Sequence, residues 1–262
     1  MKPICMLLLI TLVICHPAHC QISTSTVDSN SNPIKKTIFI YGGGLDKVWL
    51  SYIISLTHKI NPRICFIPTA AADNETTINY WYANCTDMPM RPYVLRSFII
   101  SSPEQKTFEE TILDFDAIIV GGGNTLNMLA IWRAQGIDSV LRKAYDKGIV
   151  LAGGSAGSLC WFTGGYTDSR PKEMTLLKCL GFLNYSHSPH YNVEPERRLL
   201  YRQAVLDGKL RSGYACDDMA GILFINGEMA KSVSENLWNN NYFVSVKSKE
   251  IFEEKLPAEI LK

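Results

Sequence analysis

The sequence predicts an α/β fold with a mostly parallel sheet sandwiched by helices. Two observations lead to this prediction. Short segments that are apolar throughout alternate with segments whose apolar residues follow helical spacing, a pattern typical of parallel sheets buried on both faces. Two of the apolar segments also end in three consecutive glycines, which indicates a tight turn between a strand and the helix that follows it.

The predicted elements follow one another in this alternating order. Strands are expected at Thr37–Tyr41, Arg63–Pro68, Pro92–Ile100, Ala117–Val120 and Ile149–Ala152. Helices are expected at Asp46–Ile60, Asn124–Ala134 and Ile137–Lys147, with helix and loop together between Asp73 and Met90. Towards the end of the chain, an apolar run leads into Asn226-Gly227, a hairpin signal. Further strands are expected at Gly221–Ile225, Met229–Val233 and Tyr242–Val246.

The first part of the chain is expected to be a secretory signal peptide, residues 1–20. Met1-Lys2 is a short basic start, Ile4–Ile14 is apolar, and Ala18-His19-Cys20 fits a cleavage site with small residues. The apolar run is too short for a stable transmembrane helix. A lipoprotein signal with a lipid-modified Cys20 is the alternative. The expected location is therefore secreted or periplasmic.

The remaining chain divides into two parts. Residues 21–35 are rich in serine, threonine and asparagine, which indicates a flexible leader. Residues 36–262 are long enough for a single α/β domain with a full core. The formal net charge of +1 gives no support for a nucleic-acid or membrane-surface partner, so none is expected after signal cleavage. A homodimer is compatible with the sequence.

The cysteines show no metal-binding pattern, since none of them forms a CxxC pair. Five of the eight lie after the leader, and this odd number implies a free thiol or a pair between chains. These five are Cys65, Cys85, Cys160, Cys179 and Cys216. Cys65 lies inside an expected strand and is predicted to be buried.

The most informative motif is Gly153-Gly154-Ser155-Ala156-Gly157, which follows the fifth expected strand. A serine between small residues at a strand-to-helix turn is typical of a nucleophile elbow, in which the strained turn lifts the hydroxyl above the sheet. The alternative is a glycine-rich turn whose serine caps the following helix. The motif alone does not separate these two interpretations.

A second glycine-rich turn, Gly121-Gly122-Gly123-Asn124-Thr125, follows the fourth expected strand. Its backbone N–H groups could bind an anion or form half of an oxyanion hole. It lacks the third glycine of a dinucleotide fingerprint and the Gly-Lys-Ser/Thr of a P-loop. The alternative is a tight turn capped by Asn124 or Thr125. Gly42–Gly44 lacks both fingerprints too, and is interpreted as a turn.

A serine nucleophile needs a hydrogen-bonded base and a group that orients the base. His187 and His190 lie in a segment with loop chemistry after Ser155, and Asp217-Asp218 follows further on. The order serine, histidine, acid differs from the Ser…Asp/Glu…His order of α/β-hydrolases. It fits a class I glutamine-amidotransferase-like (flavodoxin-like) fold.

Three motifs together resemble peptidase E, the α-aspartyl dipeptidases, whose serine peptidase family also contains cyanophycinase. They are Val120–Thr125, Gly153–Gly157 and Ser188-Pro189-His190-Tyr191. The resemblance spans about Lys36 to Ile225. It implies an amidotransferase-like fold and a serine peptidase that hydrolyses short peptides with an N-terminal aspartate, without a metal or organic cofactor.

The resemblance also implies roles for individual residues. Ser155 matches the nucleophile, His190 the general base and Asp218 the acid, in place of the family's glutamate. The N–H groups of Gly123 and Ala156 match the oxyanion hole. Substrate-binding roles are implied for Asn124, Arg197 and Asp168, with Arg198 as a second candidate for the arginine.

Two alternatives to an Asp-X dipeptidase remain at this point. One is a cyanophycinase-like or broader hydrolase of acidic peptides. The other is an inactive amidotransferase-like module that binds a ligand at the glycine turns.

Overall fold

The computed structural model describes residues 34–99 and 106–261 of the chain. The expected signal peptide and all but the last two residues of the expected leader lie outside the described residues. Ile34–Lys262 form one compact unit. No helix in the described part of the chain is long and apolar enough to cross a membrane.

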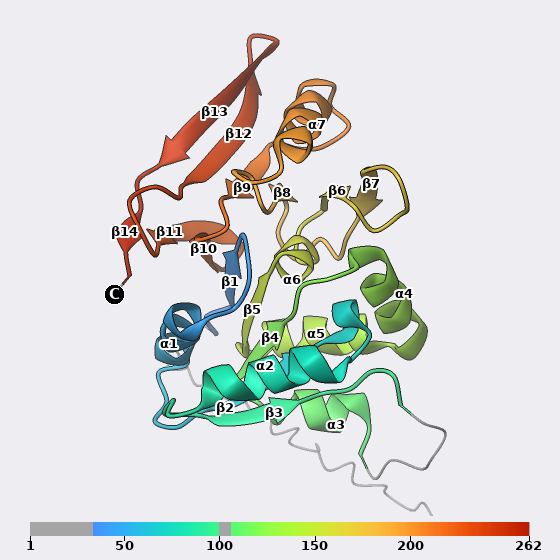
Figure 1. Ribbon diagram of the computed structural model, residues 1–262, viewed down its shortest axis with the longest axis vertical. Helices are drawn as coiled ribbons and strands as arrows, with labels where there is room; N and C mark the ends of the chain where they lie inside the picture. The colour runs from blue at the N-terminus through green and yellow to red at the C-terminus, as the bar shows by residue number, and fades with distance from the viewer. Residues whose placement is uncertain (1–33, 100–105, 262) are drawn as a thin grey trace, which may run out of the picture. The chain divides into compact units, whose positions relative to one another are not determined.

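An eight-stranded sheet forms the centre of this unit, in the order β14-β11-β10-β1-β5-β4-β2-β3 (Figure 1). The strands from β1 to β3 in this order are all parallel. They are β1 (Thr37–Tyr41), β2 (Arg63–Ile67), β3 (Arg91–Val94), β4 (Ala117–Val120) and β5 (Val150–Gly154). All five expected parallel strands are present, and the predicted fold class is confirmed.

The third strand is shorter than predicted, because β3 ends at Val94 rather than Ile100. Leu95 N–H still donates to the Phe66 carbonyl at 2.9 Å, but the chain then leaves the sheet. The N–H groups of Ser97 and Phe98 donate instead to the buried carboxylate of Asp73. The Asp73 side chain therefore takes the place of a neighbouring strand as hydrogen-bond acceptor. The apolar composition of this segment does not reveal where the strand ends.

Helices cover both faces of the sheet, and alternate residues of β1 contact different cores. Phe39 and Tyr41 pack with Trp49 of α1 and Trp81 of α2. Ile38 and Ile40 belong to the core formed with α3, α4 and α5. The bounds are α1 (Lys47–Leu56), α2 (Glu75–Cys85), α3 (Phe108–Ile112), α4 (Thr125–Gln135) and α5 (Ile137–Asp146). A 3₁₀ turn, η1 (Thr69–Ala71), precedes α2.

The other side of the sheet is built from the end of the chain. β10 (Ala220–Ile225) pairs antiparallel with β1 and with β11 (Glu228–Ser234), and β14 (Glu259–Ile260) lies at the edge. Asn226 and Gly227 join β10 to β11 with positive φ angles of 53° and 89°. This confirms the hairpin, because both central residues of a type I′ turn require positive φ.

A second sheet, in the order β13-β12-β9-β8, was only partly expected from the sequence. It contains β8 (Ser186–Ser188), β9 (Gly213–Cys216), β12 (Asn241–Lys247) and β13 (Glu250–Leu256). Helix α7 (Pro195–Leu206) packs on it through Tyr201 and Val205 (Figure 1). His187 therefore lies in a strand, where the sequence predicted a loop. Two further short elements are the paired strands β6 (Gly164–Thr167) and β7 (Thr175–Lys178).

The turn after β5 tests how closely these elements pack. A Cβ atom on Gly157 would lie 2.1 Å from the Val120 carbonyl oxygen, whereas one on Gly44 would meet no atom within 4 Å. We expect Gly157→Ala to lower the free energy of unfolding by roughly 1–3 kcal/mol, because backbone atoms must move to make room. Gly44→Ala is the matched control. Urea unfolding measures both, and equal midpoints for the two variants would contradict this account of the turn.

Candidate active site

Ser155 stands in a strained turn between β5 and the short helix α6 (Ala156–Leu159). Its φ and ψ angles are 54° and −119°, a conformation that residues with a side chain rarely adopt. The Ser155 side chain makes no capping hydrogen bond to α6. The helix-cap interpretation of the motif is therefore wrong, and the geometry is that of a nucleophile elbow.

The glycines around Ser155 are needed because backbone segments approach them closely. A Cβ atom on Gly153 would lie 2.3 Å from the Gly157 carbonyl oxygen. One on Gly154 would lie 2.2 Å from the Tyr41 ring and 2.3 Å from the Gly43 carbonyl oxygen. These contacts leave no room for a side chain at Gly153 or Gly154.

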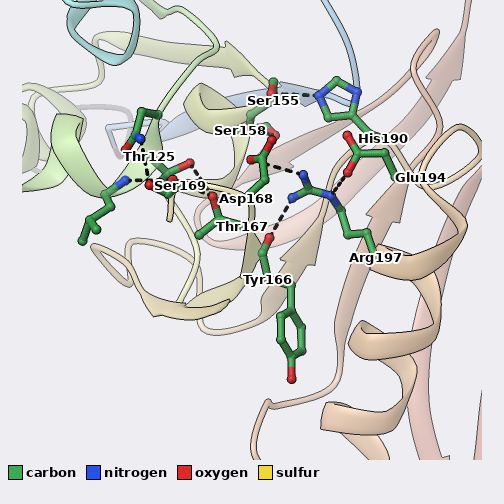
Figure 2. A network of polar contacts seen from close by, with 12 residues as sticks. Thr125, Ser155, Ser158, Tyr166, Thr167, Asp168, Ser169, His190, Glu194 and Arg197 are labelled. Atoms are coloured by element: carbon green, nitrogen blue, oxygen red, sulfur yellow. Dashed lines mark hydrogen bonds and ion pairs between the residues drawn. The ribbon is translucent and has the colours of Figure 1, made fainter. Parts of the chain in front are cut away.

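His190 connects Ser155 to a carboxylate. Its Nε2 lies 2.8 Å from Ser155 Oγ, and its Nδ1 lies 2.7 Å from Asp218 Oδ1 (Figure 2 shows the first contact). Because an ionised carboxylate only accepts, Nδ1 donates to Asp218, and Nε2 is left to accept from the Ser155 hydroxyl. The structure thus brings Ser155, His190 and Asp218 together in one hydrogen-bonded chain.

The position of this chain follows from the second sheet. His190 lies two residues past the end of β8 and Asp218 two residues past the end of β9, and these two strands pair in parallel. Parallel neighbours end at the same edge of a sheet, so residues that follow them lie side by side. The imidazole and carboxylate are 21% and 35% exposed, which leaves the site open to a substrate.

The first glycine turn, interpreted from sequence as a turn, supports the acid. Gly43 N–H donates to the Asp218 carbonyl at 2.9 Å, and a Cβ atom on Gly42 would lie 2.2 Å from the Asp217 carbonyl oxygen. Asp218 N–H donates to Asn192 Oδ1 at 3.0 Å. The signal that could have identified this role is the run of three glycines after β1.

Asp217, the alternative acid, is committed elsewhere. Its Oδ2 accepts from Asn240 N–H at 2.7 Å, and its side chain is buried. Burial raises its pKa, and the neighbouring charge of Asp218 acts in the same direction. The carboxylate that reaches His190 is that of Asp218.

The second glycine turn lies against the serine. A Cβ atom on Gly122 would be 3.2 Å from Ser155 Cβ, and Gly123 has a φ of 132° with the Ala70 carbonyl oxygen 2.3 Å from its Cβ position. Within residues 34–99 and 106–261, neither Gly123 N–H nor Ala156 N–H donates a hydrogen bond. Both donors are thus available to a bound group.

Asn124 has structural partners. Its Oδ1 accepts from Asn127 N–H and caps α4, and its Nδ2 donates to the Ser169 carbonyl, both at 2.9 Å. The capping alternative for this turn is therefore also present. One N–H of the amide remains for a substrate.

Arg197 lies in α7 and points towards the same site (Figure 2). Its Nε donates to Glu194 at 2.6 Å, and its Nη1 donates to the Tyr166 carbonyl at 2.8 Å. Its Nη2 lies 3.5 Å from Asp168, a contact too long for a normal hydrogen bond. The Arg197 side chain is 4% exposed and that of Asp168 is 70% exposed. The cation is buried, while one of its carboxylate partners is exposed.

Arg198, the second candidate, belongs to another cluster. Its guanidinium pairs with Glu253 and stands over the Tyr191 and Tyr242 rings, 4.7 and 5.4 Å from their centroids. It serves the packing of α7 against β12 and β13.

His187, the alternative base, is fully buried in β8. Its Nδ1 lies 2.9 Å from the Tyr214 carbonyl oxygen, and its Nε2 lies 2.9 Å from Ser158 Oγ. Burial lowers its pKa to about 3, so the ring is neutral at ordinary pH. Both of its ring nitrogens are thus used by Tyr214 and Ser158, and the imidazole hydrogen-bonded to Ser155 Oγ is that of His190.

No cluster of metal-binding side chains is present within the described ranges. The five cysteines after the leader are all buried and free, and Cys65 is buried as predicted.

Comparison with known proteins agrees with this geometry. The family model for Peptidase family S51 matches residues 38–233. The chain belongs to peptidase family S51. It is 40% identical over 233 residues to the uncharacterized peptidase YgaJ of Bacillus subtilis (strain 168). The aligned region covers 87% of this chain and 100% of YgaJ. The resemblance predicted from the three motifs is confirmed, and this S51 chain is a serine-type peptidase.

Solved structures show the same fold at low sequence identity. A protein from Listeria monocytogenes EGD-e named after peptidase E has a TM-score of 0.59 at 17% identity, covering 77% of this chain and 100% of that chain. A peptidase from an acI-B1 Actinobacterium has a TM-score of 0.65 at 16% identity, covering 87% and 96%. The S51 fold is therefore shared with both.

The buried His187 of this S51 peptidase predicts a pH dependence of stability. Its pKa is about 3 in the folded chain and 6.5 when exposed. Between these values the unfolded chain binds a proton that the folded chain does not, so stability falls as the pH falls through this window. For each unit by which the pH is lowered, the free energy of unfolding should fall by up to about 1.4 kcal/mol more in the wild-type chain than in His187→Phe. Urea unfolding near pH 7.5 and pH 5 measures this, and an equal pH dependence in both proteins would contradict the buried neutral ring.

Proposed function

We propose that this S51 peptidase is a secreted serine exopeptidase that hydrolyses short peptides with an N-terminal aspartate. The observation that carries the proposal is the hydrogen-bonded chain from Ser155 Oγ through His190 to Asp218. Secretion is part of the proposal and rests on the sequence of residues 1–20.

In the proposed mechanism, Ser155 Oγ attacks the scissile carbonyl carbon while His190 Nε2 takes the hydroxyl proton. Asp218 holds the ring with Nδ1–H towards itself and stabilises the imidazolium that forms. His190 then gives the proton to the leaving amine, which departs and leaves an acyl group on Ser155. Water, activated by the same imidazole, hydrolyses this acyl-enzyme and restores the serine.

The N–H groups of Gly123 and Ala156 would stabilise the negative charge on the carbonyl oxygen. Their lack of partners in the described chain supports this role, because a donor used elsewhere could not serve an oxyanion. Removing one such donor typically costs on the order of 3 kcal/mol of barrier.

The preference for aspartate would come from Arg197. Among the residues that the structure describes, its Nη2 has only the long contact to Asp168, so a substrate carboxylate can compete for it and form a charge-assisted hydrogen bond. Glu194 and the Tyr166 carbonyl would hold the guanidinium in place. Asp168 is exposed enough to move aside, and Asn124 retains one N–H for the same aspartyl group.

The experiment that tests the function uses purified residues 21–262 and a panel of Asp-X, Glu-X, Asn-X and β-Asp-Arg substrates. We expect fastest turnover of Asp-X and none above background for Ser155→Ala. Preference for β-Asp-Arg would favour a cyanophycinase-like substrate instead. Turnover that survives in Ser155→Ala would exclude the serine mechanism, and inactivity towards the whole panel would favour a binding module.

The two adjacent aspartates provide a matched pair of variants. We expect Asp218→Asn to lower kcat by about 10⁴-fold, because the amide favours the wrong imidazole tautomer. Asp217→Asn should leave kcat near the wild-type value, because Asp217 does not contact His190 and its buried carboxyl has a raised pKa. Steady-state kinetics measures both variants, and the opposite ranking would refute the assignment of the acid.

Neighbouring arginines test the specificity. Arg197→Lys keeps the positive charge but loses the planar guanidinium and its several N–H donors. We therefore expect KM for Asp-X to rise by about tenfold, equivalent to about 1.4 kcal/mol of binding free energy. KM for uncharged dipeptides should change much less. Arg198→Lys is the matched control, since Arg198 pairs with Glu253. Equal effects of Arg197→Lys on charged and uncharged peptides would reject the role in specificity.

A further inference from the structure

A second hydrogen-bonded chain involves residues close in sequence to the Ser155–His190–Asp218 chain. It likewise connects a serine hydroxyl through an imidazole to an oxygen acceptor. It runs from Ser158 Oγ to His187 Nε2, 2.9 Å, and from His187 Nδ1 to the Tyr214 carbonyl oxygen, 2.9 Å. We call it the His187 bridge. Unlike the Ser155–His190–Asp218 chain it is buried, since Ser158 and His187 are both inaccessible to solvent.

We propose that His187 is a positioning residue that holds the elements carrying Ser155, His190 and Asp218 at their working distances. The inference deepens the proposed function and rests on Ser155 being the nucleophile. It assigns His187 no contact with substrate.

Each end of the His187 bridge attaches to a different element of the site. Ser158 is in α6, the helix that starts directly after Ser155. His187 is in β8, which leads to His190, and Tyr214 is in β9, which leads to Asp218. One imidazole therefore links the elements that bear all members of the catalytic chain.

The link to the nucleophile is direct. The Ser155 carbonyl oxygen accepts from Ser158 N–H at 3.1 Å and from Leu159 N–H at 3.0 Å, and Ser158 Oγ lies 2.7 Å from it. Ser158 thus fixes the backbone of the strained residue whose hydroxyl must meet His190. Because catalysis requires reacting atoms in near-attack geometry, a small displacement there affects the rate of reaction.

The imidazole of the bridge is neutral because it is buried. The Tyr214 carbonyl only accepts, so Nδ1 carries the proton, and Nε2 and the Ser155 carbonyl oxygen both accept from the single Ser158 hydroxyl proton, which they share. The ring of His187 stacks on Phe162 with centroids 4.5 Å apart, which fixes its plane. Its burial, with the Arg197 guanidinium as a nearby positive charge, keeps it neutral. A neutral His187 adds no charge that would oppose the imidazolium formed on His190.

The test measures how fast Ser155 reacts with diisopropyl fluorophosphate, a probe that does not depend on the peptide preference. Ser158→Ala removes a single oxygen atom and with it the hydrogen bond to His187 Nε2. His187→Phe removes both hydrogen bonds of the imidazole but keeps an aromatic ring that can stack on Phe162. We expect the limiting rate of labelling to fall at least tenfold in each variant, with little change in the half-saturating concentration.

The double variant should lose no more rate than either single variant, because both remove the same link. Tyr201→Phe is the matched control. It removes another buried hydrogen bond of β8, the 2.8 Å contact to Ser186, and should label at the wild-type rate. Should His187→Phe fail to fold, Ser158→Ala decides alone.

Three results would overturn the proposal. The first is a wild-type labelling rate in Ser158→Ala, and the second is a decrease in labelling rate no larger than that of Tyr201→Phe. The third is a double variant in which the rate decreases of the two single variants multiply. A wild-type chain that the probe does not label would instead refute Ser155 as the nucleophile, and the role of the His187 bridge with it.

Discussion

The turn at Ser155 is the constraint on which the arrangement of the site depends. Its positive φ is maintained only because β5, α6 and the neighbouring turns meet at backbone-to-backbone distances around it. Gly153, Gly154 and Gly157 permit that approach. The same close packing brings the Gly121–Gly123 turn against the serine and the Gly42–Gly44 turn against the acid.

The site is assembled where two sheets meet, and each sheet supplies a different part. The turns after the parallel strands of the central sheet position Ser155 and the N–H groups of Gly123 and Ala156, which donate to no acceptor in the part of the chain that the structure describes. The second sheet delivers His190 and Asp218 from parallel strands that end together. Helix α7 carries Arg197, which contacts Glu194, the Tyr166 carbonyl and Asp168. Ser155, His190 and Arg197 thus depend on different layers.

The sequence was sufficient where chemistry is local. The parallel strands, the hairpin at Asn226-Gly227 and the elbow at Ser155 each have a short-range signature. It was insufficient where a residue distant in sequence determines the local structure. Strand β3 ends early because the Asp73 carboxylate accepts from the next N–H groups, and β8 forms because β9 pairs with it. The pair of Arg197 and Glu194 is local, because these residues are three positions apart, but the contacts of Arg197 with Tyr166 and Asp168 are tertiary contacts that no spacing rule predicts.

Peptide mapping of an acid-quenched reaction with an aspartyl ester tests whether Ser155 is the nucleophile. We expect a transient aspartyl adduct on the peptide that contains Ser155, and on no other serine. Turnover without any adduct, or an adduct on a different residue, would show that Ser155 does not form the acyl-enzyme.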